Sequence, residues 1–249
     1  MNFGPESEEV RLSNKQCAEL LKQGGLMVRN IYDFDCSEET QFWYVIKDRF
    51  GGMEELSSKM RNQVRRSFAN YDFRMIGKDY LLENGYPIHH DATSSYRAKA
   101  QPPSRQEFED DLNQGVENEF WGAFEKCSGK LVAFAKNQVL DSSCNYSVLK
   151  ALPEHLKQYV YYGLIYEMNR HYLEERRLKF VNDGARSITQ HSNIQDFLID
   201  KFHFRKAYCH LAITYRPWLK TIVCLLYPFR SIIPIRKARM ILYQEQMSR

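Results

Sequence analysis

Hydrophobic and polar positions follow two different periods along the chain of 249 residues, and the two alternate. Stretches in which β-branched and aromatic residues predominate predict strands. They are residues 26–34, 41–48, 72–77, 119–140 (a hairpin with its turn at Ser128–Gly129), 178–183 and 207–215. Stretches with apolar residues three or four positions apart predict helices. They are residues 13–24, 53–71, two short pieces within 80–118, a long helix after Pro153, and a helix from about Asn193.

Two of the predicted helices carry a clear apolar stripe. In the helix of residues 53–71, the residues that recur every four positions are Leu56, Met60, Val64 and Phe68. In the helix after Pro153, they are Leu156, Val160, Leu164, Met168 and Tyr172. Such a stripe is buried against the rest of the fold. Helix starts are also marked: Ser13 is a candidate N-cap, and Ser104 followed by Glu107 is a capping box.

Composition is that of a packed globular protein. Hydrophobic residues make up 43% of the chain, charged residues 27% and aromatic residues 14%, which excludes a disordered chain. Six cysteines are scattered without a CxxC pair, so we expect reduced thiols in a cytoplasmic protein. No spacing typical of metal ligands occurs, since His89–His90 alone is too weak a signal, and we predict no metal. The first residues are polar and acidic, unlike a signal peptide.

Charge is distributed unevenly along the chain. Residues 216–249 hold seven Lys/Arg and one acid, Glu245, which gives a net charge of +6. The whole chain carries +4, so residues 1–215 carry about −2. Basic residues do not interleave with exposed aromatic residues outside this tail, so we expect no DNA partner.

The basic tail is also unusually apolar. Residues 217–243 (PWLKTIVCLLYPFRSIIPIRKARMILY) are interrupted by Lys220 and Arg230 and broken by Pro228 and Pro234. They therefore lack the ~20 consecutive apolar residues that a membrane-spanning helix needs. One interpretation is an interfacial segment, with Trp218 and Phe229 at the headgroup boundary and its basic residues on anionic lipid. The other is a covering helix that packs back on the domain. Both stay open at the level of sequence.

A dense polar cluster lies between the strand ending near residue 183 and the helix that follows. An ordinary strand-to-helix turn needs one glycine and one capping side chain, yet residues 182–193 (NDGARSITQHSN) carry far more hydrogen-bonding capacity. Such a cluster can supply a base from Asp183, and hydrogen-bond donors to an anion or a carbonyl from Arg186, Ser187 and Asn193. We predict Asp183 and Arg186 as catalytic residues, with Ser187 and Asn193 binding substrate. The simpler alternative is a turn at Asp183–Gly184 and a helix cap.

Three arginines on the helix of residues 53–71 form a second candidate site. Arg61 and Arg65 are four positions apart, with Arg66 beside them, opposite the apolar stripe. Guanidinium groups in this arrangement bind phosphate or carboxylate in a bidentate manner. We predict that the three bind substrate; the alternative is a solvated helix face.

The order of elements is strand, helix, strand, irregular helices, hairpin, long helix, strand, helix, strand. It resembles the GNAT acyltransferase fold, and most of all the Fem-type and related GNAT-like transferases of bacteria. The stretches that carry the resemblance are LSSKMRNQVRRSF (56–68), GKLVAFA (129–135), YVYYGLIYEMNRHYL (159–173), FVNDGARS (180–187) and FLIDKFHFRK (197–206).

Two departures from that pattern are visible. The pyrophosphate signature Q/R-x-x-G-x-G/A ahead of the long helix is replaced by LPEHLKQYVYYG at residues 152–163. A tyrosine that many GNAT enzymes place ahead of the terminal strand is absent, with Ile199 near its position.

The resemblance implies a mixed α/β fold: a single GNAT-like domain with a central, mostly antiparallel sheet flanked by helices. We expect an N-terminal extension at residues 1–40, the transferase domain at 41–215 and the tail at 216–249. It also implies that the strands at about 130–138 and 179–182 are neighbours splayed around a cleft. Asp183, Arg186 and Arg61 or Arg65 would then face one cavity.

The resemblance further implies an N- or O-acyltransferase of cell-envelope or polysaccharide biosynthesis. Its donor would be an acyl-CoA, most simply acetyl-CoA, or an aminoacyl-tRNA, and its acceptor a small or lipid-linked molecule. Contact through the tail would place it at the inner face of the cytoplasmic membrane. The alternative is a non-catalytic GNAT-fold interaction module at the membrane surface.

Overall fold

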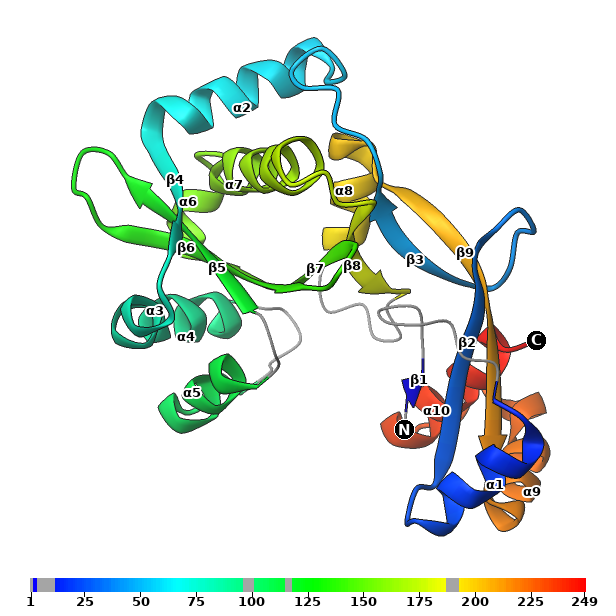
Figure 1. Ribbon diagram of the computed structural model, residues 1–249. Coiled ribbons are helices and arrows are strands. Elements are labelled where there is room, and N and C mark those ends of the chain that lie inside the picture. Colours follow the sequence, from blue (N-terminus) through cyan, green and yellow to red (C-terminus); the bar gives the residue numbers. More distant parts are fainter. Residues whose placement is uncertain (1, 4–11, 96–100, 115–117, 187–192) are drawn as a thin grey trace. The chain divides into compact units, whose positions relative to one another are not determined.

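The computed structural model describes residues 2–3, 12–95, 101–114, 118–186 and 193–249 (Figure 1). The chain forms two compact units. We call them the terminal unit (residues 1–45, 185–190 and 206–249) and the central unit (residues 46–184 and 191–205). The division predicted from the sequence, at residues 40 and 215, stays a prediction.

The central unit contains a sheet with the strand order β4-β5-β6-β7-β8. Its strands are β4 (Tyr71–Ile76), β5 (Asn118–Glu125), β6 (Leu131–Val139), β7 (Ser143–Ala151) and β8 (Phe180–Ala185, of which Ala185 belongs to the terminal unit). The three pairings from β4 to β7 are antiparallel, and β7 pairs with β8 in parallel. The hairpin predicted for residues 119–140 is confirmed, with Gly129 at φ +70° in its turn.

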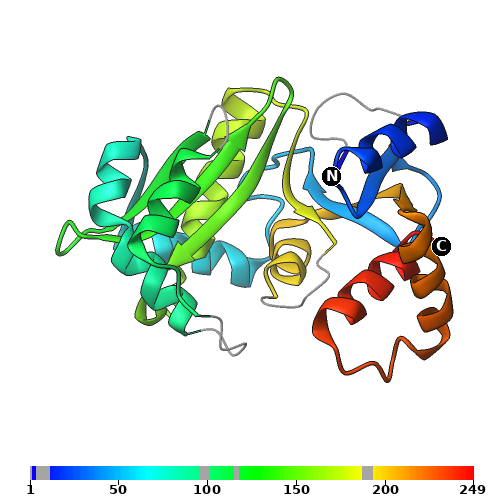
Figure 2. The ribbon, with the colours of Figure 1, turned by 90° about the horizontal axis from the view of Figure 1, so that it is seen from below.

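Helices cover both faces of this sheet. On one face lie α2 (Ser58–Asn70) and α7 (Val160–Asn169), and on the other lie α3 (Lys78–Asn84), α4 (Tyr86–Ser94) and α5 (Arg105–Asn113), as Figures 1 and 2 show. Because both faces are covered, the strands are buried on both sides: the pattern of β6 is buried at eight of its nine positions. The remaining helical elements of this unit are α6 (Pro153–Leu156), a π-helical turn η1 (Arg170–Glu175) and α8 (Ile194–Phe202).

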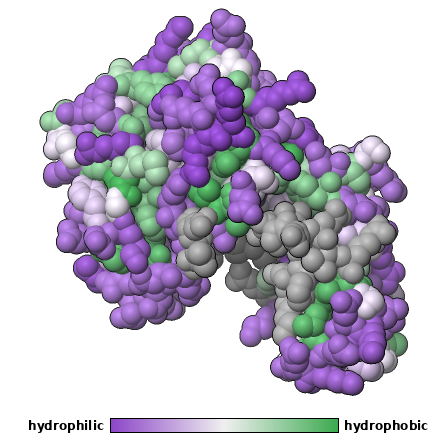
Figure 3. All heavy atoms as spheres, viewed as in Figure 1, coloured by the Kyte–Doolittle hydropathy of each residue, from purple (hydrophilic) through white to green (hydrophobic). Residues whose placement is uncertain are grey.

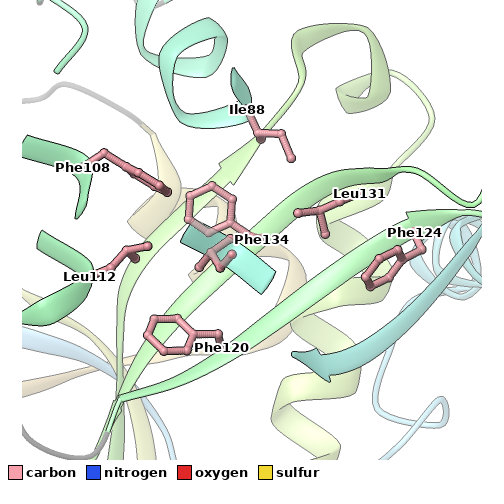
Figure 4. Packing of buried hydrophobic residues seen from close by; sticks show 8 residues of the cluster. Ile88, Phe108, Leu112, Phe120, Phe124, Leu131 and Phe134 are labelled. Carbon is pink, nitrogen blue, oxygen red and sulfur yellow. The ribbon is translucent and has the colours of Figure 1, made fainter. Parts of the chain in front are cut away.

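A core of large apolar side chains joins α3, α4 and α5 to strands β5 and β6 (Figure 4). It comprises Leu81, Ile88, Phe108, Leu112, Phe120, Phe124, Leu131 and Phe134. The capping box predicted at Ser104 is present, with the Ser104 hydroxyl accepting from the Glu107 amide and the Glu107 carboxylate accepting from the Ser104 amide. It starts α5 at the point where Phe108 and Leu112 reach this core.

On the opposite face, α2 and α7 approach each other closely at Gly163. A Cβ atom at this position would lie 2.3 Å from a ring carbon of Phe73 and 2.6 Å from the Ser67 hydroxyl. Ser67 is fully buried, donates to the Tyr159 carbonyl at 2.7 Å and accepts from the Gly163 amide at 3.1 Å. The buried stripe of α2 therefore ends at Ser67, with Phe68 half-buried, one position from where the period of four predicted it.

The terminal unit has the strand order β1-β2-β9-β3. Its elements are β1 (Asn2–Phe3), α1 (Asn14–Lys22), β2 (Met27–Cys36), β3 (Phe42–Lys47, residues 42–45 in this unit), β9 (Arg205–Tyr215, residues 206–215 in this unit), α9 (Pro217–Leu226), the 3-10 turn η2 (Tyr227–Phe229) and α10 (Arg236–Met247). Strand β2 pairs with β1 in parallel and with β9 in antiparallel fashion. The N-cap predicted at Ser13 is confirmed as part of a capping box with Gln16.

The predicted fold class, mixed α/β with a mostly antiparallel sheet flanked by helices, is confirmed. One prediction within it is wrong: the strands at 130–138 and 179–182 are not neighbours, because β7 lies between them. The sequence had shown no strand at residues 143–151. The long helix after Pro153 is also broken, because Tyr159 takes left-handed backbone angles between α6 and α7.

Candidate functional site

The parallel pair β7–β8 separates soon after it forms. Its register joins residues 143–145 to residues 180–182, and β7 then runs on to Ala151 with no further β8 partner in the described part of the chain. A cavity of about 780 Å³ follows this stretch of β7. Its walls are residues 146–151 of β7, Asp183 of β8, His89, Ala92 and Ser95 at α4, Asp111 of α5, Leu156, Tyr161 and Tyr162 near the start of α7, and Asn193, Ile194 and Phe197 at the start of α8.

Asp183 supplies the carboxyl group on the β8 side of this cavity. Burial raises its pKa from the ordinary value to about 7, and a hydrogen bond with Gln195 of α8 opposes part of that rise. A carboxyl group that titrates near pH 7 can accept a proton from a substrate at neutral pH and release it again. Its protonation state can therefore change at neutral pH.

The residues on either side of Asp183 hold the backbone in place. The Asn182 side chain accepts a hydrogen bond from the Gly184 amide at 2.9 Å and donates to the Cys144 carbonyl at 3.5 Å. Gly184 has φ +82°, a left-handed conformation that favours glycine. Part of the polar cluster noted in the sequence is therefore structural, because Asn182 and Gly184 build the turn that carries Asp183.

Tyrosine side chains form the wall next to Asp183. The Tyr146 hydroxyl donates to Asn169 Oδ1 at 2.9 Å. Burial raises the pKa of Tyr146, and the nearby Asp183 carboxylate adds to that rise. Tyr162 packs edge-on against Phe197 of α8 with ring centroids 5.0 Å apart. Burial also raises the pKa of Tyr162, so both tyrosines line the cavity as neutral phenols.

The cavity has a second group of polar residues between α4 and β7. Lys150 Nζ lies 3.5 Å from the Thr93 hydroxyl. Burial, with the Lys150 charge as the next cause, lowers the pKa of His89 to about 4, so this imidazole is neutral at pH 7. Its Nδ1 atom is buried and has no hydrogen-bond partner among the described residues. Asp111, also on the wall, pairs with the buried Lys136 at 3.4 Å.

Sequence reasoning found part of this site and missed part. Asp183 and Asn193 line the cavity as predicted, and Ser187 lies outside the described residues. Asn193 is also the residue at which α8 begins, without a side-chain capping bond. The residues missed, Tyr146, Lys150 and His89, sit on the unrecognised strand β7 and on α4. The pair His89–His90 was the only signal on α4.

None of the three arginines of α2 is among the described residues that line this cavity, and the expectation that Arg186 shares it with Asp183 stays a prediction. Arg186 belongs to the terminal unit, where it donates to the Gln41 carbonyl at 2.7 Å and to the Tyr243 hydroxyl at 3.1 Å. Its guanidinium carbon also lies 4.0 Å from the Trp43 ring centroid. These contacts engage two of the five N–H donors of Arg186, so its predicted role with a substrate stays a prediction.

The arginines of α2 have different surroundings. Arg61 donates to the Leu56 carbonyl at 3.1 Å and to the Ser58 hydroxyl at 3.2 Å, so it closes the first turn of its own helix. Arg65 is exposed. The guanidinium of Arg66 lies 5.3 Å from the ring centroid of Tyr159, the residue at which α7 begins. In Figure 3, hydrophilic residues predominate at the top of the view, where α2 lies.

Neither a metal cluster nor a membrane-spanning helix is found in the part of the chain that the structure describes. No three His, Cys, Asp or Glu side chains come together there as a metal site would require. None of its helices combines the length and the apolar character needed to cross a bilayer.

The architecture defines a GNAT-like fold, in which a mixed sheet opens between two parallel strands. Among solved structures, the chain is similar to FemX, with a TM-score of 0.58, 10% identity, and coverage of 88% of this chain and 72% of that chain. It is similar to L-PGS from Bacillus licheniformis, with a TM-score of 0.53, 11% identity, and coverage of 88% and 76%. The resemblance to Fem-type and other GNAT-like proteins is therefore confirmed at the level of the fold.

A further match is shorter. The ribosomal-protein-S18-alanine N-acetyltransferase from Escherichia coli is 23% identical over 43% of this chain, with a TM-score of 0.35, and the match spans 62% of its own length. No protein-family model matches the chain, and no curated protein matches it in sequence.

Proposed function

We propose that the protein is an acyltransferase in which Asp183 is the general base. The observation that carries the proposal is a carboxyl group with a pKa of about 7 on the wall of a cavity of about 780 Å³, at the point where β7 and β8 separate. General bases work best when their pKa lies near the working pH. The fold shared with FemX supports this reading.

In the proposed reaction an amine or hydroxyl group of the acceptor attacks the acyl carbon. The new C–N or C–O bond forms while the bond from that carbon to sulfur (acyl-CoA) or oxygen (aminoacyl-tRNA) breaks. The proton lost by the acceptor moves to Asp183, and the leaving group takes up a proton in turn. Asn193, on the same cavity wall, would donate a hydrogen bond to the developing oxyanion. Catalytic or binding roles for Arg186 and Ser187 stay predictions.

The edge of β7 offers a place for an extended donor. Beyond Asn145 this edge faces the cavity, and its peptide groups can pair with the amides of an extended chain, as an added strand would. The pantetheine arm of coenzyme A is such a chain. Tyr161 contacts this edge through its hydroxyl, 3.5 Å from the Leu149 carbonyl. Acyl-CoA, most simply acetyl-CoA, is therefore the donor we favour, with aminoacyl-tRNA as the second candidate.

Donor phosphates would bind near the start of α7. Helix N-termini attract anions, and α7 begins at Tyr159 without a side-chain cap. Arg66 of α2 lies over the Tyr159 ring at this point. Arg61 and Arg65 also belong to α2. We propose Arg66 as the first phosphate ligand among the three arginines, with Arg61 and Arg65 as further candidates.

The acceptor and the location follow from the resemblance and from the tail. We infer a polar acceptor of cell-envelope or polysaccharide biosynthesis, small or lipid-linked, and a cytoplasmic enzyme that meets it at the inner face of the membrane. The alternative is a non-catalytic interaction module with the same fold. The missing pyrophosphate signature at residues 152–163 favours that alternative.

A binding screen separates the two. Calorimetric titration of the purified protein with acetyl-CoA, longer acyl-CoAs and aminoacyl-tRNA should show saturable binding of one donor class. Ser147 is exposed on the cavity wall, so Ser147→Trp should block binding, whereas Ser128→Trp in the β5–β6 turn should not. If none of the donors binds, the non-catalytic interpretation replaces the enzyme.

A further inference from the structure

Large apolar side chains gather on the outer face of the tail in the terminal unit. The apolar tail surface, as we call it, consists of Trp218, Ile222, Leu225, Leu226, Phe229, Ile232 and Ile235. Seven of the eleven exposed large hydrophobic residues in the described chain thus fall within eighteen consecutive positions. Leu225 is 67% exposed and Ile232 is 74% exposed. Single exposed apolar residues scattered over a surface are normal, whereas a concentration such as this one marks an interaction site.

The opposite face of the tail is packed. Leu219 and Val223 of α9 are buried together with Tyr215 of β9 and Leu242 of α10. The exposed large apolar residues of α9 are Trp218, Ile222, Leu225 and Leu226, at the spacing of a second helix face. The covering interpretation therefore applies to the face with Leu219 and Val223, and the interfacial interpretation stays a prediction. One face covers the domain, and the other is left without a partner in the described chain.

The charged residues of this stretch of the chain have one sign. From Arg216 to Gln244 the chain has six Lys/Arg and no acid. Among these, Lys220, Lys237 and Arg239 are exposed. The nearest acid in sequence, Glu245, is engaged by the Tyr215 hydroxyl at 3.0 Å and by Arg249 at 3.2 Å.

The start of α10 adds an independent observation. The first turn of the helix contains Lys237, and its N-cap residue, Ile235, makes no side-chain capping bond. Cations at a helix N-terminus are repelled by the helix dipole, and the first amide groups there need acceptors. An anionic group at this position would relieve both effects at once.

We propose that the apolar tail surface is a docking site for a bilayer surface that contains anionic lipid. The exposed side chains of α9, η2 and Ile232–Ile235 enter the headgroup boundary, and Lys220, Lys237 and Arg239 contact lipid phosphates. This inference goes beyond acyl transfer, and vesicle binding tests it without donor or acceptor. It therefore stands or falls separately from the proposed reaction.

A bilayer fits the surface better than a second copy of the chain. In a symmetric dimer the same surface would meet itself, and its exposed basic residues would face like charges with no acid between Arg216 and Gln244 to pair with them. An anionic membrane supplies both the apolar layer and the opposite charge. An aromatic side chain such as Trp218 is favoured at that depth.

Vesicle flotation with the full chain tests the contribution of the apolar side chains to membrane binding. The protein should float with vesicles of phosphatidylcholine containing about 30% phosphatidylglycerol and should bind pure phosphatidylcholine at least about tenfold more weakly. Leu225→Glu or Ile232→Glu should lower binding to the anionic vesicles about tenfold or more. Met75→Glu, at a residue of β4 that is 46% exposed, is the matched control and should bind as the wild type does. Circular dichroism checks that each variant is folded.

The charge contribution has its own variant pair. The double variant Lys237→Gln/Arg239→Gln should bind the anionic vesicles more weakly, and its binding should depend less on salt. The reason is that fewer cationic side chains are left whose attraction to the lipid phosphates salt can screen. Lys15→Gln/Lys22→Gln, on α1, should change neither. The proposal is overturned if the wild type stays unbound at low salt, or if Leu225→Glu floats as well as the wild type. It is equally overturned if Leu225→Glu dissociates a dimer in solution while no vesicle binding occurs.

Discussion

At the scale of single residues, Asp183 is the proposed base, and its burial also lowers the free energy of unfolding at neutral pH. In the unfolded chain its pKa has the ordinary value near 4, while burial raises the pKa to about 7 in the folded protein. The folded state therefore holds the proton more tightly, so the stability that this residue contributes is complete below pH 4 and is lost as pH rises to 7. One pKa unit corresponds to about 1.4 kcal/mol, so the loss approaches about 4 kcal/mol at most.

This linkage predicts how Asp183→Asn changes stability with pH. Near pH 4 the free energy of unfolding of the variant should be close to that of the wild type. At pH 8 it should exceed that of the wild type by about 1–4 kcal/mol, because only the wild type must bury a charge at that pH. Urea unfolding at pH 4.5, 6 and 8 measures the difference. Asp200→Asn, at an exposed position on α8, is the control and should show no such trend. A constant difference across pH would contradict the raised pKa.

Prediction of single residues from the sequence succeeded where the order of neighbouring elements determines the position of a side chain. Asp183 follows a strand and Asn193 starts a helix, so both reach the cavity by their position in a β–turn–α unit. It does not determine the contacts of Arg186 and Arg61, because a long side chain reaches whichever carbonyl or aromatic ring is near. In this protein these partners are Gln41 and Trp43 for Arg186, and Leu56 for Arg61.

At the scale of elements, the contact between α2 and α7 depends on the absence of a side chain at Gly163. Gly163→Ala would drive its new methyl group into Phe73 and into the hydroxyl of Ser67. We expect a loss of about 1–3 kcal/mol in the free energy of unfolding, the usual cost of overpacking. Gly25→Ala, where the nearest atoms lie 3.9 Å from the new Cβ, should change it by less than about 0.5 kcal/mol. Equal stability of the two variants in urea unfolding would contradict the close packing.

The two faces of the tail predict a second contrast in stability. Leu242 is 1% exposed in the core of the terminal unit, and Leu225 is 67% exposed on the apolar tail surface. Leu242→Ala should destabilise this unit by about 2–4 kcal/mol, because it leaves a cavity. Leu225→Ala should cost less than about 0.5 kcal/mol in the absence of vesicles. A reversed order in thermal or urea unfolding would show that the packed and exposed faces are misassigned.

Strand β7 shows where element prediction from the sequence stops. Its residues, SCNYSVLKA, include two serines, an asparagine and a lysine, and they lack the β-branched density of the hairpin before them. The strand is specified by its antiparallel pairing with β6, a long-range contact that a local pattern cannot reveal. Missing β7 also hid the cavity wall, since Tyr146 and Lys150 are carried by it.

At the scale of the whole molecule, the order of elements predicted the fold class better than any motif did. The fold class was confirmed although the sequence identity to FemX is only 10%. Order constrains topology strongly, since few sheets accommodate a given succession of strands and helices. The division into a terminal and a central unit could not be read in this way, because residues 206–215 join β2 only after the chain has folded.

The central claim, that Asp183 is the base of an acyl transfer in the β7–β8 cavity, has one direct test. It is the rate of transfer from the donor identified by titration, measured against pH for the wild type and for Asp183→Asn. The wild-type rate should rise with pH through a midpoint near 7, the pKa of this carboxyl. Asp183→Asn should lose about 10²-fold in rate and keep its donor affinity. An Asp183→Asn variant that turns over at the wild-type rate would contradict the account.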